Sequence, residues 1–248
     1  MDPRNGGDTA PSPPSLMDRL LPPGLIVIFH GLDRPQRAVD AAEAPFWVAG
    51  NVLAQVVAWA GRTRLQITFD DGNASDYEVA FPMLAEAGLS GTFFVLAGRM
   101  DQPGSLTRAQ VREMAAAGMT IGSHGHDHVR WTEADDPTMR RELHDARARI
   151  EDCLGTAVTE LSIPFGAFDA RVMRLVAEAG YRHVHTSAKA MASPASWFLP
   201  RYTIAQWTNV DREIPAWTSL PSRLRSGVRN ELRARRFGFS TSTAGPGR

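Results

Sequence analysis

A repeating unit constrains the fold of this 248-residue chain more than any other feature. In each unit an amphipathic segment ends at a glycine, a short apolar run follows, and polar residues close the run. In three of these units the amphipathic segment covers 75–88, 107–118 and 169–180. The apolar runs that follow are LSGTFFVLA, MTIGSHG and YRHVHTS. Glycine is typical of the residue after a helix, because it takes the left-handed conformation cheaply. The pattern therefore predicts helices that alternate with strands.

Two more apolar runs extend this pattern towards the N-terminus, GLIVIF at 24–29 and RLQITF at 64–69. Thr107 and Gln110 have the spacing of a capping box and mark the start of one helix. Strands that alternate with helices imply parallel strands with the helices outside. We therefore expect an α/β fold, a deformed (β/α) barrel of parallel strands, with fewer than eight strands.

Composition divides the chain into three parts. A flexible, proline-rich tail is expected over 1–23, the barrel domain over 24–212, and an arginine-rich extension over 213–248. From residue 218 onwards seven arginines accompany a single acid, Glu231. Two interpretations of this extension stay open, a docking tail for an anionic surface or polymer and a solvated helix with a frayed end.

Overall charge and cysteine content exclude several classes of protein. The formal net charge is zero, which gives no electrostatic footprint for nucleic acid. Cys153 is the only cysteine, so an intramolecular disulfide framework and a cysteine-rich metal site are excluded. No apolar run is long enough to cross a membrane, and the N-terminus lacks the basic start of a signal peptide. A cytoplasmic location is the resulting expectation, and the oligomeric state stays open.

Acids and histidines follow the predicted strands directly. His30 follows GLIVIF, Asp70 and Asp71 follow LQITF, and His124 and His128 follow MTIGS. Reactive residues of such barrels lie at the carboxyl ends of the strands. We therefore expect these five side chains to share one rim of the barrel.

The motif SHGHDH is typical of a metal site. His124 and His128 are four residues apart, so on a helical turn both imidazoles lie on one face and can meet one metal ion. His126 is either a bystander or a residue that supports the ligands. Two histidines and one carboxylate would leave open positions on Zn²⁺ or a similar ion.

The acid pair Asp70-Asp71 supplies the carboxylate. Two carboxylates about 4 Å apart repel each other by roughly 4 kcal/mol near a protein surface. A dication in contact with one aspartate offsets that repulsion and leaves the other free to act as a base. The alternative is that the acids cap a helix that starts after Gly72.

Three motifs in this order resemble the polysaccharide deacetylase family, whose catalytic region is the NodB homology domain (carbohydrate esterase family 4). They are TFDDG at 68–72, SHGHDH at 123–128, and IPFGAFD at 163–169, which looks like the third motif in its PFG form. The resemblance covers roughly 25–205. It implies a deformed (β/α) barrel that removes acetyl groups from N-acetylated sugars with the help of a metal.

Carried over by position, the resemblance implies a role for each motif residue. Asp70 would be the general base, and a backbone N–H in the turn Pro164, Phe165, Gly166 would hold the developing oxyanion. The metal is usually zinc, with Co²⁺ or Ni²⁺ as other options. Its implied ligands are Asp71, His124 and His128.

Two departures from the family pattern affect the catalytic assignment. The arginine of the third motif is replaced by Ser162, and Arg201 in the segment LPRY resembles an arginine that orients the base in the PFG branch. The late Leu-x-His motif is absent, and His30 looks like the acid histidine of permuted members. Arg201 is otherwise a structural arginine and His30 a packed strand-end residue. For His183 and His185 we expect core or rim roles.

The leading prediction is a metal-dependent N-deacetylase of an N-acetylhexosamine-containing poly- or oligosaccharide. Alternatives are an inactive, metal-binding glycan recognition protein, an amidohydrolase that acts on a non-sugar amide, and an Fe(II) oxygenase with the same ligand types. Sugar rings could stack on four tryptophans, whose commoner use is core packing. They are Trp47, Trp131, Trp197 and Trp207.

Overall fold

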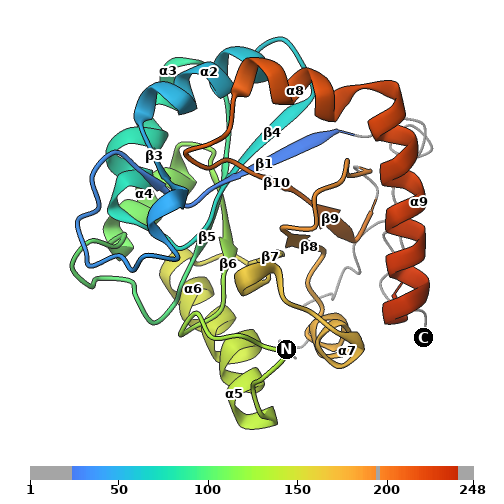
Figure 1. The fold of residues 1–248 in the computed structure, drawn as a ribbon. Helices are drawn as coiled ribbons and strands as arrows, with labels where there is room; N and C mark the ends of the chain where they lie inside the picture. Colours follow the sequence, from blue (N-terminus) through green and yellow to red (C-terminus); the bar gives the residue numbers. More distant parts are fainter. Residues whose placement is uncertain (1–23, 194–195, 240–248) are drawn as a thin grey trace, which may run out of the picture.

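A single parallel sheet forms the centre of the molecule (Figure 1). The computed structural model describes residues 24–193 and 196–239. Eight strands follow the order β10-β1-β4-β5-β6-β7-β8-β9, and each neighbouring pair is parallel. The strands are β1 (Leu25–Phe29), β4 (Leu65–Phe69), β5 (Thr92–Val95), β6 (Thr120–Ser123), β7 (Glu160–Ser162), β8 (His183–Thr186), β9 (Phe198–Pro200) and β10 (Tyr202–Thr203). The predicted deformed (β/α) barrel is confirmed.

One extended segment joins the two edges of this sheet. β9 pairs with β8 and β10 pairs with β1, and only Arg201 separates β9 from β10. The Arg201 N–H donates to the Thr186 carbonyl at 2.8 Å, and the Ile204 N–H donates to the Ile28 carbonyl at 2.9 Å. The sequence predicts fewer than eight strands. The barrel sheet of the described residues has eight, two of which are the halves of this interrupted segment.

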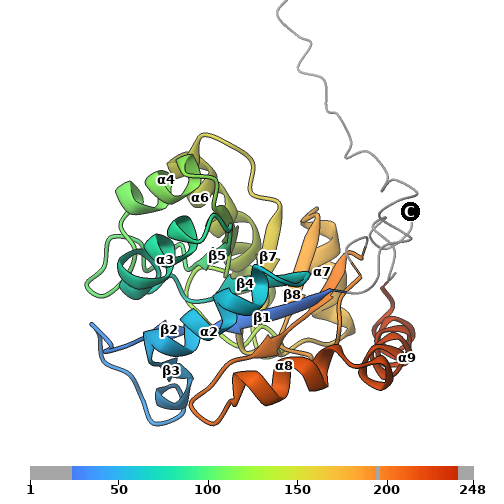
Figure 2. The ribbon, with the colours of Figure 1, turned by 90° about the horizontal axis from the view of Figure 1, so that it is seen from above.

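Helices surround the barrel (Figures 1 and 2). Thr107 and Gln110 form the predicted capping box at the start of α4. Gly118 and Gly180 have φ values of 89° and 74°, the left-handed conformation expected where a helix gives way to the next strand. The helices are α2 (Gly50–Ala60), α3 (Phe81–Glu86), α4 (Arg108–Ala116), α5 (Asp136–Arg140), α6 (Ala146–Leu154), α7 (Ala170–Glu178), α8 (Val210–Thr218) and α9 (Leu220–Phe237).

Short elements complete the fold. A two-stranded parallel sheet pairs β2 (Gly31–Leu32) with β3 (Trp47–Val48) beside the rim that follows β1. One π-helical turn precedes α3 and another joins α5 to α6. Together with two 3-10 turns, these short helices are η1 (Ala44–Phe46), η2 (Asp76–Ala80), η3 (Arg141–Asp145) and η4 (Pro164–Gly166).

An aromatic stack crosses three neighbouring strands in the barrel core. Phe29 of β1 stacks on Phe69 of β4 with ring centroids 5.6 Å apart, and Phe69 stacks on Phe93 of β5 at 4.5 Å. All three side chains are fully buried. Each contributes about 1.5–3 kcal/mol through burial. Because Phe69 directly precedes Asp70, this packing fixes the strand end that carries the acid pair.

The C-terminal helices pack on the barrel layer. α8 contacts α2, and α9 contacts α7 and α8. The boundary predicted between residues 212 and 213 falls inside α8. The predicted N-terminal tail, 1–23, and the last residues of the extension, 240–248, lie outside the described residues.

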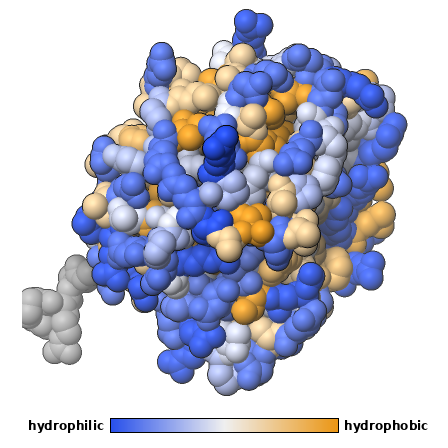
Figure 3. All heavy atoms as spheres, turned by 60° about the vertical axis from the view of Figure 1, so that its left-hand side comes forward, coloured by the Kyte–Doolittle hydropathy of each residue, from blue (hydrophilic) through white to orange (hydrophobic). Residues whose placement is uncertain are grey.

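The surface of the described chain is mainly hydrophilic. On the face shown in Figure 3, hydrophilic residues predominate and apolar residues form smaller groups between them. Within 24–193 and 196–239, no helix combines the length and the apolar character that crossing a bilayer requires. Cys153 is buried as a free thiol.

Candidate active site

Three predicted ligands meet at the carboxyl ends of β4 and β6. Asp71 Oδ1 lies 3.5 Å from His124 Nε2 and 3.3 Å from His128 Nε2. One ligand atom from each residue lies within 4.8 Å of the other two. Asp71 Oδ1 is buried and has no hydrogen-bond donor among the described residues. A buried carboxylate oxygen that faces two imidazole nitrogens fits a divalent cation.

Neighbouring groups set the orientation of both imidazoles. His124 Nδ1 hydrogen-bonds to the Ser162 carbonyl at 2.9 Å, which leaves Nε2 directed at Asp71. Such a bond on the far nitrogen fixes the tautomer of a ligating histidine. The His128 ring stacks on Phe165 at 4.4 Å. Burial lowers the pKa of His128 to about 4, against the opposing charge of Asp71, so the imidazole is neutral, as a metal ligand must be.

A buried acid that the sequence analysis missed shapes the histidine loop. Glu142 accepts hydrogen bonds from the backbone N–H groups of His126 and Asp127, both at 2.9 Å, and from the Trp131 indole at 3.3 Å. Gly125 has a φ of 85°, and a Cβ there would lie 2.2 Å from Glu142 Oε2. Glycine at this position is therefore required for the loop to close over Glu142.

His126 does not join the metal cluster. Its Nδ1 hydrogen-bonds to Asp127 at 2.6 Å, and Asp127 also pairs with Arg141 at 2.5 Å. Both predicted possibilities, a bystander and a residue that supports the ligands, place His126 outside the ligand set, and these contacts agree with that.

Arg201 holds the second acid from the barrel seam, which is the point between β9 and β10 where the two edges of the sheet are joined. Arg201 binds Asp70 in a bidentate pair with two N–H···O distances of 2.8 Å. Ser162 Oγ donates to Asp70 Oδ2 at 3.0 Å and lies 2.6 Å from Arg201 Nη2. Thr68 Oγ1 accepts from the same guanidinium at 2.9 Å. Ser162, at the position of the missing third-motif arginine, therefore shares the carboxylate with Arg201, which lies between β9 and β10.

Electrostatics keep Asp70 ionised. Burial acts to raise the pKa of Asp70, but the adjoining Arg201 guanidinium and His124 hold the pKa well below its ordinary value. Burial also acts against the charge of Asp71, and His128 and His124 lower its pKa. Both carboxylates are thus available as anions, one paired with Arg201 and the other facing two imidazoles.

His30 lies near the acid pair. Its Nδ1 is buried with no hydrogen-bond partner among the described residues, and its ring packs on Phe46 at 5.2 Å. Asn73 fixes the backbone by donating to the His30 carbonyl at 2.7 Å. Burial acts to raise the pKa of both aspartates, and His30 is a smaller contribution to lowering it, after Arg201 and His124 for Asp70 and after His128 and His124 for Asp71. An imidazole next to the acid pair with one free nitrogen is suited to proton transfer.

The PFG turn supplies one free backbone donor. Pro164 has no N–H, and the Gly166 N–H donates to the Ile163 carbonyl at 3.0 Å. The Phe165 N–H has no acceptor in the described part of the chain. Phe165 itself has a φ of 59°, and its ring is 53% exposed beside His128. Of the three residues predicted to hold an oxyanion, Phe165 carries the available donor.

His183 and His185 are not part of the metal cluster and share an acid. His183 Nδ1 and His185 Nε2 each lie 2.8 Å from one oxygen of Glu160. Burial acts to raise the pKa of Glu160, but the hydrogen bonds from the two histidines lower it to about 2. This agrees with the predicted core or rim roles.

Glu160→Gln is expected to lower the free energy of unfolding by about 1.5–3 kcal/mol at pH 7, since hydrogen bonds to a charged group are lost. The stabilisation should be complete above the pKa of an unfolded glutamate, about 4.3, and disappear as the pH falls towards 2. Urea unfolding at pH 7, 5 and 3 measures this, with the exposed Glu178→Gln as control. A difference that does not shrink at pH 3 would contradict it.

Only one of the four tryptophans offers an exposed ring. Trp47, Trp131 and Trp197 are buried in the core, whereas Trp207 is 69% exposed. The Trp207 ring meets Phe46 edge-on at 5.9 Å, and Phe46 contacts His30. Trp207 is therefore the tryptophan placed to contact a ligand at this rim.

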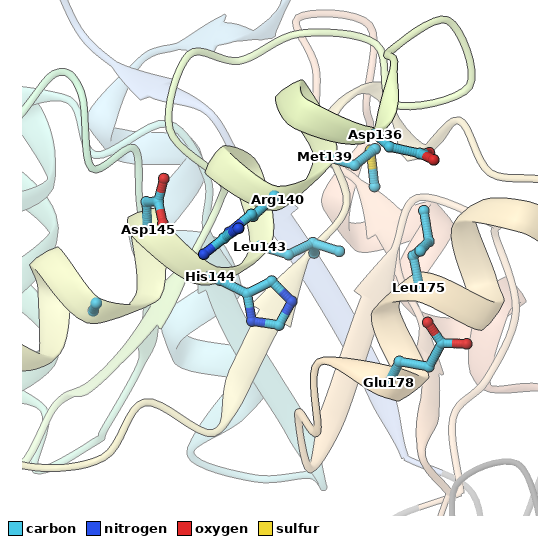
Figure 4. A pocket seen from close by; sticks show the side chains of 9 residues that line it. Asp136, Met139, Arg140, Leu143, His144, Asp145, Leu175 and Glu178 are labelled. Carbon is cyan, nitrogen blue, oxygen red and sulfur yellow. The ribbon is translucent and has the colours of Figure 1, made fainter.

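A separate hollow opens in the outer helical layer between α5–α6 and α7 (Figure 4). None of the candidate active-site residues lines it. Its walls are Asp136, Met139, Arg140, Leu143, His144, Asp145, Ala148, Leu175 and Glu178.

Comparison with known proteins identifies the family. The polysaccharide deacetylase family matches residues 60–184. A chitooligosaccharide deacetylase of Rhizobium leguminosarum bv. trifolii is 30% identical over 167 residues, which cover 66% of this chain and 69% of the relative. A Bacillus subtilis protein assigned to the polysaccharide deacetylases is 28% identical, and the match covers 51% of this chain and 46% of that protein. The chain belongs to the polysaccharide deacetylase family, as its motifs predict.

Solved structures share the fold. A Streptococcus pyogenes deacetylase in complex with acetate superposes with a TM-score of 0.68 at 19% identity, over 77% of this chain and 96% of the other. A polysaccharide deacetylase of Bacillus cereus gives 0.64 at 18% identity, over 78% and 68%. These similarities agree with the barrel described above.

Proposed function

We propose that this protein is a metal-dependent hydrolase that removes N-acetyl groups from an N-acetylhexosamine-containing poly- or oligosaccharide. The observation that carries the proposal is the pairing of a three-residue ligand cluster with a separate, arginine-bound carboxylate one residue away. Membership of the polysaccharide deacetylase family supports hydrolysis of an amide C–N bond. The name of the Rhizobium relative supports a chitooligosaccharide-like substrate.

Asp71, His124 and His128 would hold the metal, with Zn²⁺ as the first choice and Co²⁺ or Ni²⁺ as alternatives. When bound, such an ion supplies Lewis-acid chemistry that polarises a carbonyl and activates water. The donor set of two neutral imidazoles and one carboxylate, with Asp71 Oδ1 left unpartnered, supports this assignment.

Asp70 would act as general base. Its low pKa keeps it ionised, and the bidentate Arg201 pair fixes the direction of its lone pairs. It would accept the proton from the water that attacks the amide carbonyl. The Phe165 N–H would donate to the oxygen on which negative charge develops, a contact whose loss typically lowers a rate by about 10²–10³.

His30 would protonate the leaving amine, because an amine leaves poorly as an anion. His30→Ala is expected to lower kcat by about 10², within the range of general acid catalysis, while metal content stays near that of the wild type. Steady-state kinetics and metal analysis of the purified variant measure both. The exposed His144→Ala is the control. Full activity of the His30 variant would direct the search for the acid to His126 or His183.

Arg201→Met is expected to lower the free energy of unfolding by about 3–5 kcal/mol, because the substitution leaves the buried Asp70 carboxylate without its cation. Urea unfolding at pH 7 measures the loss. The surface pair Arg174–Glu178 provides a matched control, and Arg174→Met should change stability by no more than about 0.5 kcal/mol. Equal effects of the two substitutions would show that the buried pair does not stabilise the seam.

Acetate release tests the proposed function. The protein would be chelated, reloaded with Zn²⁺, Co²⁺ or Ni²⁺, and incubated with N-acetylglucosamine oligomers of increasing length. The expected result is acetate release that requires a metal and occurs with zinc in the absence of oxygen. Glycan binding without acetate release under any condition would favour the recognition protein. Release only from small non-sugar amides would favour the amidohydrolase.

A further inference from the structure

Helix α9 exposes a row of large apolar side chains. Leu220, Leu224, Val228 and Leu232 are between 59% and 69% exposed and recur every four residues. Residues at this spacing share one face of a helix. We call this row the apolar stripe. In Figures 1 and 2, α9 lies at the periphery of the molecule.

The opposite face of α9 contacts the rest of the protein through apolar and polar side chains. Ser226 Oγ accepts from the Met191 N–H at 2.9 Å, and Asn230 Nδ2 donates to the Met191 carbonyl at 3.0 Å. Arg233 donates to the Ala188 carbonyl at 2.6 Å. The inner face thus combines hydrogen-bonding side chains with apolar core contacts, while the large side chains of the apolar stripe lie outside. Clustered exposed apolar side chains mark an interaction site.

The positive charge of α9 indicates the kind of partner that this surface binds. The exposed arginines on α9 outnumber its one acid, Glu231, which bonds to Arg235 at 3.0 Å. A second copy of the same helix would bring like charges together. An anionic bilayer suits both features, because acyl chains receive the stripe and lipid phosphates pair with guanidinium groups. The exposed arginines are Arg225, Arg229, Arg235 and Arg236.

We propose that α9 binds the surface of an anionic lipid bilayer, with the apolar stripe at the boundary between headgroups and acyl chains. The 18-residue helix is already folded on the protein, so binding does not require it to be ordered first. It would lie in the plane of the interface rather than cross it. This proposal concerns a different surface from the candidate active site and stands independently of the catalytic proposal.

Cosedimentation of the full chain with vesicles tests it. We expect the protein to partition onto phosphatidylcholine vesicles that contain phosphatidylglycerol, and to stay in solution with phosphatidylcholine alone. The double variant Leu224→Ser, Val228→Ser should bind at least tenfold more weakly. Each of Arg225→Gln and Arg229→Gln should weaken binding about fivefold. Trp207→Ser is the matched control, since it removes an equally exposed apolar side chain outside the stripe.

Circular dichroism melting would show that the double variant is folded, as expected for substitutions on an exposed face. Equal binding to neutral and anionic vesicles, or binding that the double variant retains in full, would overturn the proposal. So would a concentration-dependent dimer in analytical ultracentrifugation that Val228→Ser abolishes, if the wild type does not bind vesicles. That result would assign the stripe to a second copy of the chain.

Discussion

Asp70→Asn is expected to lower the rate of acetate release by about 10²–10⁴, the usual contribution of a positioned base, while metal content stays unchanged. Asparagine has nearly the same shape as aspartate but cannot accept a proton from water at neutral pH. The carboxylate that faces both imidazoles belongs to Asp71, so the metal cluster should survive the substitution. Single-turnover kinetics on a metal-loaded variant, with metal quantified in the same sample, measure both quantities.

Asp127→Asn is the matched control for that experiment, since Asp127 is an acid of the histidine loop that bonds to His126 and Arg141 rather than to the site. It should keep wild-type activity. Urea unfolding is needed as well, because Arg201 loses its counter-ion when Asp70 is replaced. Activity of the Asp70 variant within a few-fold of wild type would refute the base assignment. Simultaneous loss of metal would refute the assignment of Asp70 as the base and Asp71 as the metal ligand.

His128→Ala is expected to abolish metal retention and activity together. Removing even a residue that supports a ligand typically lowers metal affinity 10–100-fold, so removal of a ligand should exceed that loss. Metal stoichiometry after desalting and acetate release at saturating metal are the two measurements. Because His128 is 20% exposed at its side chain, a small cavity left by alanine should not unfold the chain.

His126→Ala is the control for that loss, as it removes an imidazole from the same loop without touching the cluster. It should retain both metal and activity. Unchanged metal stoichiometry in the His128 variant would mean that the cluster is not the metal site. Equal losses in the two variants would point to disruption of the loop instead of loss of a ligand.

Local sequence patterns predicted the parts of this fold that depend on neighbouring residues. Glycine-terminated helices and buried apolar runs define the strands that carry Asp70, Asp71 and His124. The i, i+4 spacing anticipated that His124 and His128 would approach one acid, although His128 reaches it from a loop with a φ of 57° rather than from a helical turn. For these residues, the order of the strands along the chain and their parallel direction were sufficient to predict that the side chains meet at one rim.

Contacts between distant segments could not be predicted in the same way. Nothing near Glu142 in the sequence marks it as the acceptor for the backbone of the histidine loop, 15 residues or more away. Likewise, nothing near Glu160 in the sequence predicts that it bonds to two histidines, because both of them come from β8. The apolar residues of α9 recur every four positions in the sequence, but the exposure of their side chains depends on how the opposite face of the helix packs on the protein.

Arg201 is the single residue between β9 and β10, and it also grips Asp70 with two hydrogen bonds. Separation of the β9–β10 segment from β8 and β1 would move the Arg201 guanidinium and break its hydrogen bonds to Asp70. Arg201 therefore links closure of the barrel to the position of the Asp70 carboxylate beside the ligand cluster.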